Sequence, residues 1–274
     1  MHVHFLDPYQ RRSSPLHRLD PRVKLVLTLA YILTCALTPE GAWPVYVLLF
    51  ALILSVEILS ALSIRSVHRR ALLALPFMLA ALPVMFTSGG DSLLSLPVGS
   101  WEFTIYTQGL IRFISVALKS WLSVQAAVLL ASSTPFPDLL YSLRAIRVPK
   151  LLVAMFGLMW RYLFVLADEA VRLTRARAAR SGVGSETDGR GRKVRHGGTL
   201  SWRARVTGGM AGNLFLRAFE RSDRIYMAMV ARGYDGETLS LPQLPVSPSA
   251  WRVLASGLIV LFLLLLSAIM FWGR

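Results

Sequence analysis

The chain has 274 residues, of which 54% are hydrophobic, and its mean hydropathy is +0.53. Thirty Lys and Arg residues against fifteen Asp and Glu give a formal net charge of +15. This composition excludes an ordinary soluble domain and indicates several membrane spans, so the basic residues are expected to mark loops kept in the cytoplasm.

Six apolar runs follow one another along the chain and are candidates for spans, which need about 17–25 residues. They lie at about 23–37, 44–62, 71–86, 110–131, 151–167 and 253–272. Pro76 and Pro83 are expected to kink the third run, which a membrane helix can tolerate.

Lys and Arg placement orients these runs. The N-terminal tail up to Lys24 carries five such residues, and the connection after the second run carries Arg65, Arg69 and Arg70. The connections after the first and third runs carry none. The positive-inside tendency therefore predicts a cytoplasmic N-terminus and four spans that alternate in direction.

The fifth run, at 151–167, has basic residues on both sides, and thirteen Lys and Arg residues lie between Arg172 and Arg224. It also contains Arg161, which is costly in lipid. We therefore expect this run not to cross but to begin a long helix, reaching about Arg180, at or below the membrane surface. The last run then crosses outward, which makes five spans and leaves Arg274 outside.

The cytoplasmic part between the fourth and last spans has an order of its own. The Gly-rich stretch 181–198 indicates a flexible loop, and a second helix is expected at about 211–232, with Gly233 as its stop signal. The predicted fold is all-α and polytopic, with about five transmembrane helices plus long cytoplasmic helices. The predicted regions are 1–131 (four spans), 132–250 (cytoplasmic) and 251–274 (last span).

Sequence signals for chemistry are sparse. There is no Gly-Lys dipeptide, hence no P-loop, and no His-Glu-x-x-His motif. The opening Met1-His2-Val3-His4 could bind a metal, but an exposed tail is the favoured reading. We expect no catalytic residues, no bound cofactor and no metal ligands. Glu57 and Lys119 lie within spans, where they should face other helices, water or a partner subunit.

Two arginines end the predicted cytoplasmic helices among small residues. The first element is Ala179-Arg180-Ser181 and the second is Ala231-Arg232-Gly233. Small neighbours let another protein approach closely, and the guanidinium offers five donors to carboxylates or carbonyls. From spacing alone, these arginines could equally serve the helix dipole or lipid headgroups.

Several stretches together resemble the transmembrane (T) components of energy-coupling factor (ECF) transporters, of the cobalt-transport type called CbiQ. They are 16–24 (LHRLDPRVK), 148–149 (VP), 160–170 (WRYLFVLADEA), 176–181 (ARAARS), 214–221 (LFLRAFER) and 231–236 (ARGYDG). Each alone is a weak signal, whereas the set in this order is specific.

The resemblance implies a non-catalytic scaffold in the bacterial inner membrane whose cytoplasmic coupling helices end in Ala-Arg-Gly-like signatures. Each signature would dock on one of two ABC-type ATPase subunits, which bind the ATP and Mg²⁺. The six residues that would bind them are Ala179, Arg180, Ser181, Ala231, Arg232 and Gly233. Ser181 departs from the family pattern, where glycine stands. A separate membrane subunit would bind the substrate.

Cobalt is the substrate that the resemblance favours, with nickel close behind and a vitamin next. A stand-alone permease for a metal ion or small solute is the alternative function, although Glu57 and Lys119 are thin support for a polar path. An intramembrane enzyme has no identifiable nucleophile. Nucleic acid is not an expected partner, because the basic run lacks interleaved aromatic residues.

Overall fold

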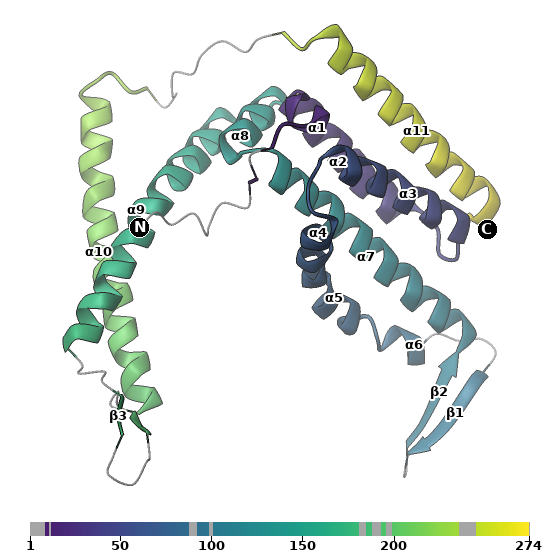
Figure 1. The fold of residues 1–274 in the computed structure, drawn as a ribbon, viewed down its shortest axis with the longest axis horizontal. Helices are drawn as coiled ribbons and strands as arrows, with labels where there is room; N and C mark the ends of the chain where they lie inside the picture. The colour runs from purple at the N-terminus through teal and green to yellow at the C-terminus, as the bar shows by residue number, and fades with distance from the viewer. Residues whose placement is uncertain are drawn as a thin grey trace. The chain divides into compact units, whose positions relative to one another are not determined.

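The computed structural model describes residues 9–10, 12–87, 92–98, 101–180, 185–187, 193–195, 199–235 and 245–273. The chain divides into two compact units (Figure 1). The first, here called the bundle unit, comprises Pro8–Ile146 and Gln243–Arg274, and the helix-pair unit comprises Met1–Asp7 and Arg147–Pro242. The predicted division at residues 131 and 250 concerns the membrane and stays a prediction.

Helices make up most of the bundle unit. They are α1 (Pro15–Arg18), α2 (Pro21–Leu37), α3 (Trp43–Leu59), α4 (Ile64–Ala71), the 3₁₀ helix η2 (Leu72–Ala74), α5 (Leu75–Ala80), α6 (Val84–Thr87), α7 (Thr107–Ser133), α8 (Phe136–Ala145) and α11 (Pro248–Trp272). The strands β1 (Ser92–Val98) and β2 (Trp101–Tyr106) form one antiparallel hairpin.

Two of the long helices begin with a polar cap followed by proline. The Asp20 carboxylate accepts a hydrogen bond from the backbone N–H of Arg22 at 2.9 Å, and the Ser247 hydroxyl accepts one from Ala250 at 3.3 Å. A proline after the cap fits the first turn, because its missing N–H would have no helical partner there.

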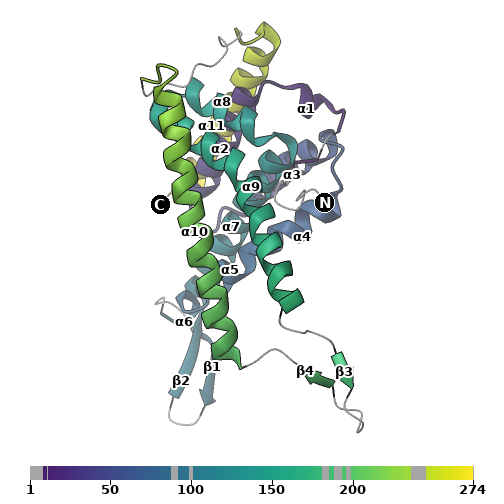
Figure 2. The ribbon, with the colours of Figure 1, turned by 90° about the vertical axis from the view of Figure 1, so that its left-hand side faces the viewer.

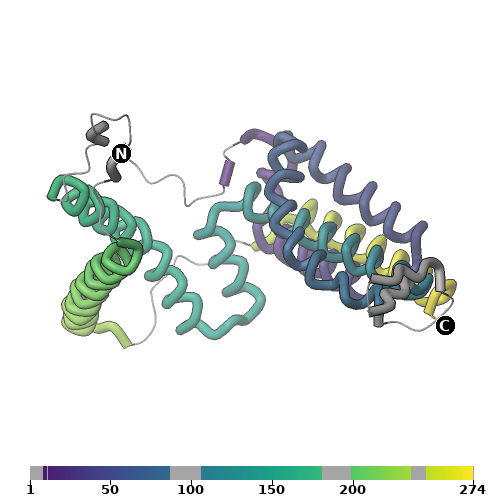
Figure 3. Tube along the Cα trace, turned by 90° about the horizontal axis from the view of Figure 1, so that it is seen from below, coloured from purple at the N-terminus to yellow at the C-terminus, as the bar shows by residue number. Residues whose placement is uncertain are grey.

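α2 is central to the bundle unit and packs against both α7 and α11, and these helices lie alongside one another in Figure 3. The core contains Tyr31 and Cys35 of α2, Leu49 of α3, Leu122 of α7 and Leu261 of α11. Most other large apolar side chains of α3 and α11 are exposed, as expected for helices whose outer faces meet lipid.

The third apolar run is interrupted. It divides into α4, η2, α5 and α6, with Pro76 at the start of α5 and Pro83 in the turn before α6. Proline removes a helical donor and its ring clashes with the preceding turn. The expected disturbance at the prolines therefore takes the form of breaks in the helix, at η2 before Pro76 and at the turn that contains Pro83.

Several short elements of the bundle unit were not predicted, among them a hairpin and a helix in the connections. The β1–β2 hairpin occupies the connection after the third run, and α8 follows the fourth. Both are short, and a short segment gives little periodicity from which its structure could be read.

The helix-pair unit consists of α9 (Lys150–Arg180), α10 (Leu200–Val230) and a small antiparallel hairpin of β3 (Ser185–Thr187) and β4 (Lys193–Arg195). Figure 2 shows α9 and α10 beside each other. The long helix expected to reach Arg180 is confirmed. The expected start of the second helix at about 211 is wrong, because α10 continues through Gly208, Gly209 and Gly212.

The reading of 181–198 as a flexible loop is also corrected where the structure describes it. Ser185 pairs with Arg195 and Thr187 with Lys193. The β-branched residues Thr187 and Val194 have a high propensity for an extended backbone, which fits this pairing.

Among the residues that the structure describes, four helical stretches are long and apolar enough to cross a membrane: residues 64–86, α7, α9 and α11, with α3 as a shorter apolar helix. The predicted helical, multi-pass fold is therefore confirmed, and the two small hairpins are the exceptions within the described residues. α9 meets this criterion by length and composition only. Its predicted location outside the bilayer depends on the charges that flank it and stays a prediction.

Candidate docking site on the helix pair

The C-terminal end of α10 has a defined geometry that explains its glycine. Gly233 has a φ of +80°, in the left-handed region that favours glycine. Its N–H donates to the Val230 carbonyl at 2.9 Å, and the Tyr234 N–H donates to the Met229 carbonyl at 3.0 Å. This pair of bonds is a Schellman motif. The predicted role of Gly233 as the helix stop is confirmed.

Arg232 lies inside this turn and is exposed, as are Ala231 and Gly233. The Arg232 N–H donates to the Met229 carbonyl at 3.0 Å, which fixes the backbone from which the side chain projects. The second predicted element is thus a tight, solvent-facing turn with an arginine at its tip.

The first element ends α9. Ala179 and Arg180 are exposed, and Arg180 is the last residue of the helix. Ser181 lies outside the described residues. Arg180 is also placed to interact with the partly negative C-terminal end of the helix, so the dipole role remains open for it.

α9 and α10 run antiparallel. The Arg177 guanidinium, near the end of α9, donates to the Thr207 hydroxyl at 3.0 Å and lies 5.7 Å from the Trp202 ring centroid, early in α10. Residues early in α9 line the same groove as Met229 and Tyr234. Each helix has 31 residues and is about 45 Å long. Arg180 and Arg232 therefore lie at opposite ends of the pair.

The pair has almost no apolar core. Along α10, every residue of which is described, no side chain is buried, and in α9 only Ala154 and Glu169 are. The Glu169 carboxylate accepts hydrogen bonds from Arg217 Nη1 at 3.3 Å and Arg221 Nη2 at 3.0 Å. A buried carboxylate with two guanidinium partners is a strong, directional link between the helices.

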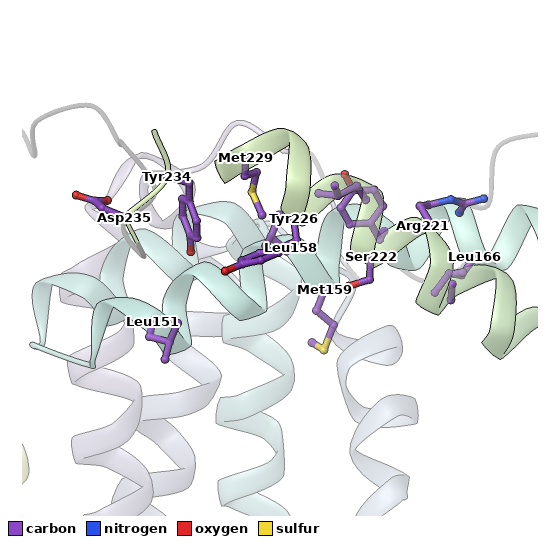
Figure 4. A pocket seen from close by; sticks show the side chains of 13 residues that line it. Leu151, Leu158, Met159, Leu166, Arg221, Ser222, Tyr226, Met229, Tyr234 and Asp235 are labelled. Carbon is purple, nitrogen blue, oxygen red and sulfur yellow. The ribbon is translucent and has the colours of Figure 1, made fainter. Parts of the chain in front are cut away.

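A groove of about 720 Å³ lies between the two helices (Figure 4). Its α9 wall includes Leu151 and Met159, and its α10 wall includes Tyr226 and Met229, while Tyr234 and Asp235 stand at one end. Arg221 also lines it, so the ion-paired guanidinium forms part of the wall. The groove is mainly apolar and open, which suits a protein or lipid contact.

The charged residues within the bundle contact other helices, as predicted. Glu57 is 1% exposed, and its Oε2 lies 3.7 Å from Nδ1 of His68 on α4. Lys119 Nζ is 3.5 Å from the Ala36 carbonyl of α2. Among the described residues, no group of three or more His, Cys, Asp or Glu side chains is arranged to hold a metal ion.

The stretch 16–24 joins the start of α2 to the ends of α7 and α8. Lys24 Nζ donates to the carbonyls of His17 and Ser133, each at 3.4 Å. Arg22 hydrogen-bonds the Tyr141 hydroxyl, and its guanidinium carbon lies 4.5 Å from that ring's centroid. Arg22 and Lys24 therefore hold the stretch 16–24 against α8 and the C-terminal end of α7.

Sequence reasoning placed the arginines but missed the groove and the Glu169 link. Both stretches, 160–170 and 214–221, were noted for their resemblance to a family, yet the pairing of Glu169 with Arg217 and Arg221 was not inferred. A signal was available: Glu169 is an acidic residue in a helix with a strongly basic second half.

These features define a class: multi-pass helical membrane proteins that carry a long pair of exposed helices with arginines at its ends. The chain belongs to the CbiQ family, described as "Cobalt transport protein", whose family model matches residues 12–244. It is accordingly a T component of the ECF transporter type and a non-catalytic transporter subunit.

Relatives of known name agree with this membership. The chain is 26% identical over 283 residues to the energy-coupling factor transporter transmembrane protein EcfT of Clostridium kluyveri, with 98% of each chain covered. It is 29% identical over 168 residues to the cobalt transport protein CbiQ of Rhodobacter capsulatus, covering 61% of this chain and 63% of that one.

A putative fused cobalt transport protein, CbiMQ, of Methanocorpusculum labreanum is 27% identical over 241 residues. The match covers 84% of this chain and 36% of the fused protein, so the chain spans about a third of that relative's length.

Proposed function

We propose that this chain is the energy-coupling subunit of an ATP-driven uptake transporter, and that it links two ABC-type ATPase subunits to a substrate-binding membrane subunit. Arg180 and Arg232 are the two docking residues, with Ala179, Ser181, Ala231 and Gly233 allowing close approach. The observation that carries the proposal is the location of two exposed arginines at opposite ends of one antiparallel helix pair.

Two docking sites at opposite ends of the helix pair suit two separate ATPase subunits better than two sites at the same end would. Each helix is about 45 Å long and the two arginines lie at opposite ends of the pair, so each ATPase subunit can bind its own end. The guanidinium presents five donors in a rigid fork, which fits a carboxylate or a ring of backbone carbonyls in the partner. Movement of the two ATPases toward each other then acts on both helix ends at once.

The remaining parts of the proposal concern orientation, energy source and cargo. The chain lies in the cytoplasmic membrane of a prokaryote with its N-terminus and helix pair in the cytoplasm, since the basic residues cluster there. ATP and Mg²⁺ are bound by the ATPase partners and no cofactor by this chain. Cobalt is the proposed cargo, selected by the separate membrane subunit, because the family description and two relatives carry that name.

The test is charge reversal at both docking residues. The double variant Arg180→Glu and Arg232→Glu is expressed together with ATPase subunits and a substrate-binding subunit from the same organism, and complexes are isolated through a tag on this chain. We expect membrane insertion to persist and co-purified ATPase to fall at least tenfold. The matched control, Arg172→Glu with Arg224→Glu, makes the same charge change at exposed positions of the same helices.

ATPase recovery at the control's level in the docking variant overturns the assignment of these arginines. Cargo is tested separately, by uptake of Co²⁺, Ni²⁺ and a mixture of B vitamins into vesicles that contain the complete complex. Uptake of Ni²⁺ or a vitamin in preference to Co²⁺ contradicts the cobalt proposal and leaves the docking proposal unaffected.

A further inference from the structure

The contacts between α9 and α10 point to a role for Glu169 that the docking proposal does not include. An apolar core normally fixes the angle and spacing of two packed helices, and this pair lacks one. The groove of about 720 Å³ occupies the space where such a core would lie. Polar contacts must therefore determine how the helices are held.

Two polar contacts join the described parts of the helices. One is the hydrogen bond from Arg177 to Thr207, which is exposed. The other is the Glu169 carboxylate with Arg217 and Arg221. The Glu169 side chain is 9% exposed, that of Arg221 is 29% exposed and that of Arg217 is 51% exposed, so the better-buried pair is Glu169 with Arg221. An exposed contact contributes little, because water and salt compete with it, whereas a buried carboxylate depends on its partners.

The Glu169 link lies at the same distance along the helices from each of the two docking residues. Arg180 lies eleven residues after Glu169, and Arg232 lies eleven residues after Arg221. At about 1.5 Å per residue, each arginine is about 16 Å from the link along its own helix. Glu169 is therefore midway between the two ends on which the proposed partners act.

We propose that Glu169 is a positioning residue that, through Arg217 and Arg221, fixes the separation of the two arginine ends, so that the helix pair moves as one body. The inference rests on the proposed function for its biological meaning, but the link itself can be measured in the isolated subunit. Without it, each helix follows its own ATPase and the motion is not transmitted to the membrane part.

The link is tested by measuring distances between spin labels by double electron–electron resonance. Cys35 is replaced by alanine, and labels are attached to cysteines at Ala176 and Ala228, which are exposed positions near the two helix ends. The full-length subunit in lipid nanodiscs should give one narrow distance peak. Glu169→Gln should broaden or split that peak, since a neutral amide pairs poorly with two guanidiniums.

Two further variants separate positioning from general damage. Asp168→Asn changes the neighbouring exposed carboxylate and should leave the narrow peak intact. The triple exchange Glu169→Arg, Arg217→Glu and Arg221→Glu reverses every charge of the link and should restore the peak that Glu169→Gln loses. A merely destabilised helix would not recover when the charges are exchanged.

The same variants in the complete complex connect the link to transport. We expect Glu169→Gln to retain ATPase binding while substrate uptake is lost, and the triple exchange to recover part of the uptake. A wild-type peak width in Glu169→Gln, or no recovery in the triple exchange, overturns the positioning role. If the docking variants of Arg180 and Arg232 fail instead, the docking proposal falls while the distance result for Glu169 stands.

Discussion

Replacing Gly233 tests whether the left-handed turn at the end of α10 holds Arg232 in place. A Cβ added at Gly233 meets no atom within 4 Å, so a substitution there causes no steric clash with the rest of the protein. The free-energy cost of a substitution at Gly233 therefore comes from the backbone alone, because its φ is +80°. An L-residue in this region costs about 1–2 kcal/mol, which corresponds to a change of about 5- to 30-fold in a local equilibrium.

Hydrogen exchange followed by mass spectrometry measures this equilibrium directly. The Gly233 and Tyr234 amides donate to Val230 and Met229, so they are protected only while the turn is closed. In Gly233→Ala the peptide that carries these amides should exchange about 5 to 30 times faster. Gly233→Asn should show a smaller change, because asparagine tolerates the left-handed region better than other residues.

Gly212→Ala is the matched control. Gly212 lies within α10 and also has open space around a built Cβ, but its φ is not positive. Alanine there favours the helix by about 1 kcal/mol and should not speed exchange at the end. If Gly233→Ala exchanges within twofold of the wild type, the left-handed glycine does not determine the turn, and the reason given for glycine at this position is refuted.

The other predictions concern the bundle unit. Glu57→Gln should change the free energy of unfolding by less than about 1 kcal/mol. Glu57→Lys buries an unpaired ammonium and should lower the free energy of unfolding by about 3 kcal/mol or more. Equal melting temperatures of the two variants in detergent would contradict this. Burial lowers the pKa of His17 below its ordinary value of 6.5. The folded state therefore binds fewer protons, so the stability contribution is full above pH 6.5 and is lost as the pH falls through the lowered pKa. Unfolding midpoints measured against pH should show this loss, and His17→Gln should remove it. A Cβ at Gly257 would lie 2.6 Å from Leu27 Cδ2, the flexible end of that side chain. Gly257→Ala should therefore be tolerated, whereas Gly257→Leu should destabilise the α2–α11 contact by about 1–3 kcal/mol, as thermal unfolding can measure.

Local features of the fold were predictable because they depend on few residues. Gly233 stops α10 through its own φ, and Pro76 and Pro83 interrupt the third run because proline cannot donate within a helix. The charge pattern around 151–167 predicts that α9 lies outside the bilayer, and this stays a prediction. None of these inferences needed a partner from elsewhere in the chain.

Features that depend on distant partners were not predictable. Glu169 lies 48 and 52 residues from its partners, and nothing in the spacing specifies that pairing. The groove exists only because two separate helices leave space between them. The start of α10 was placed about eleven residues too late, because α10 begins at Leu200 and runs through Gly208 and Gly209. Each of these glycines has open space around it and costs only about 1 kcal/mol relative to alanine.

Under the proposed function, the unequal distances on either side of Glu169 would make α9 a lever that turns about this residue. The arm toward Arg180 has eleven residues, whereas the arm toward Lys150 has nineteen, so the ratio is about 1.7. A turn about Glu169 that shifts the arginine end by about 3 Å would sweep the opposite end through about 5 Å. That far end continues through Val148-Pro149 into the bundle unit. Under the proposed function, the end of α9 that leads into the bundle unit would therefore move farther than the end that meets the ATPase.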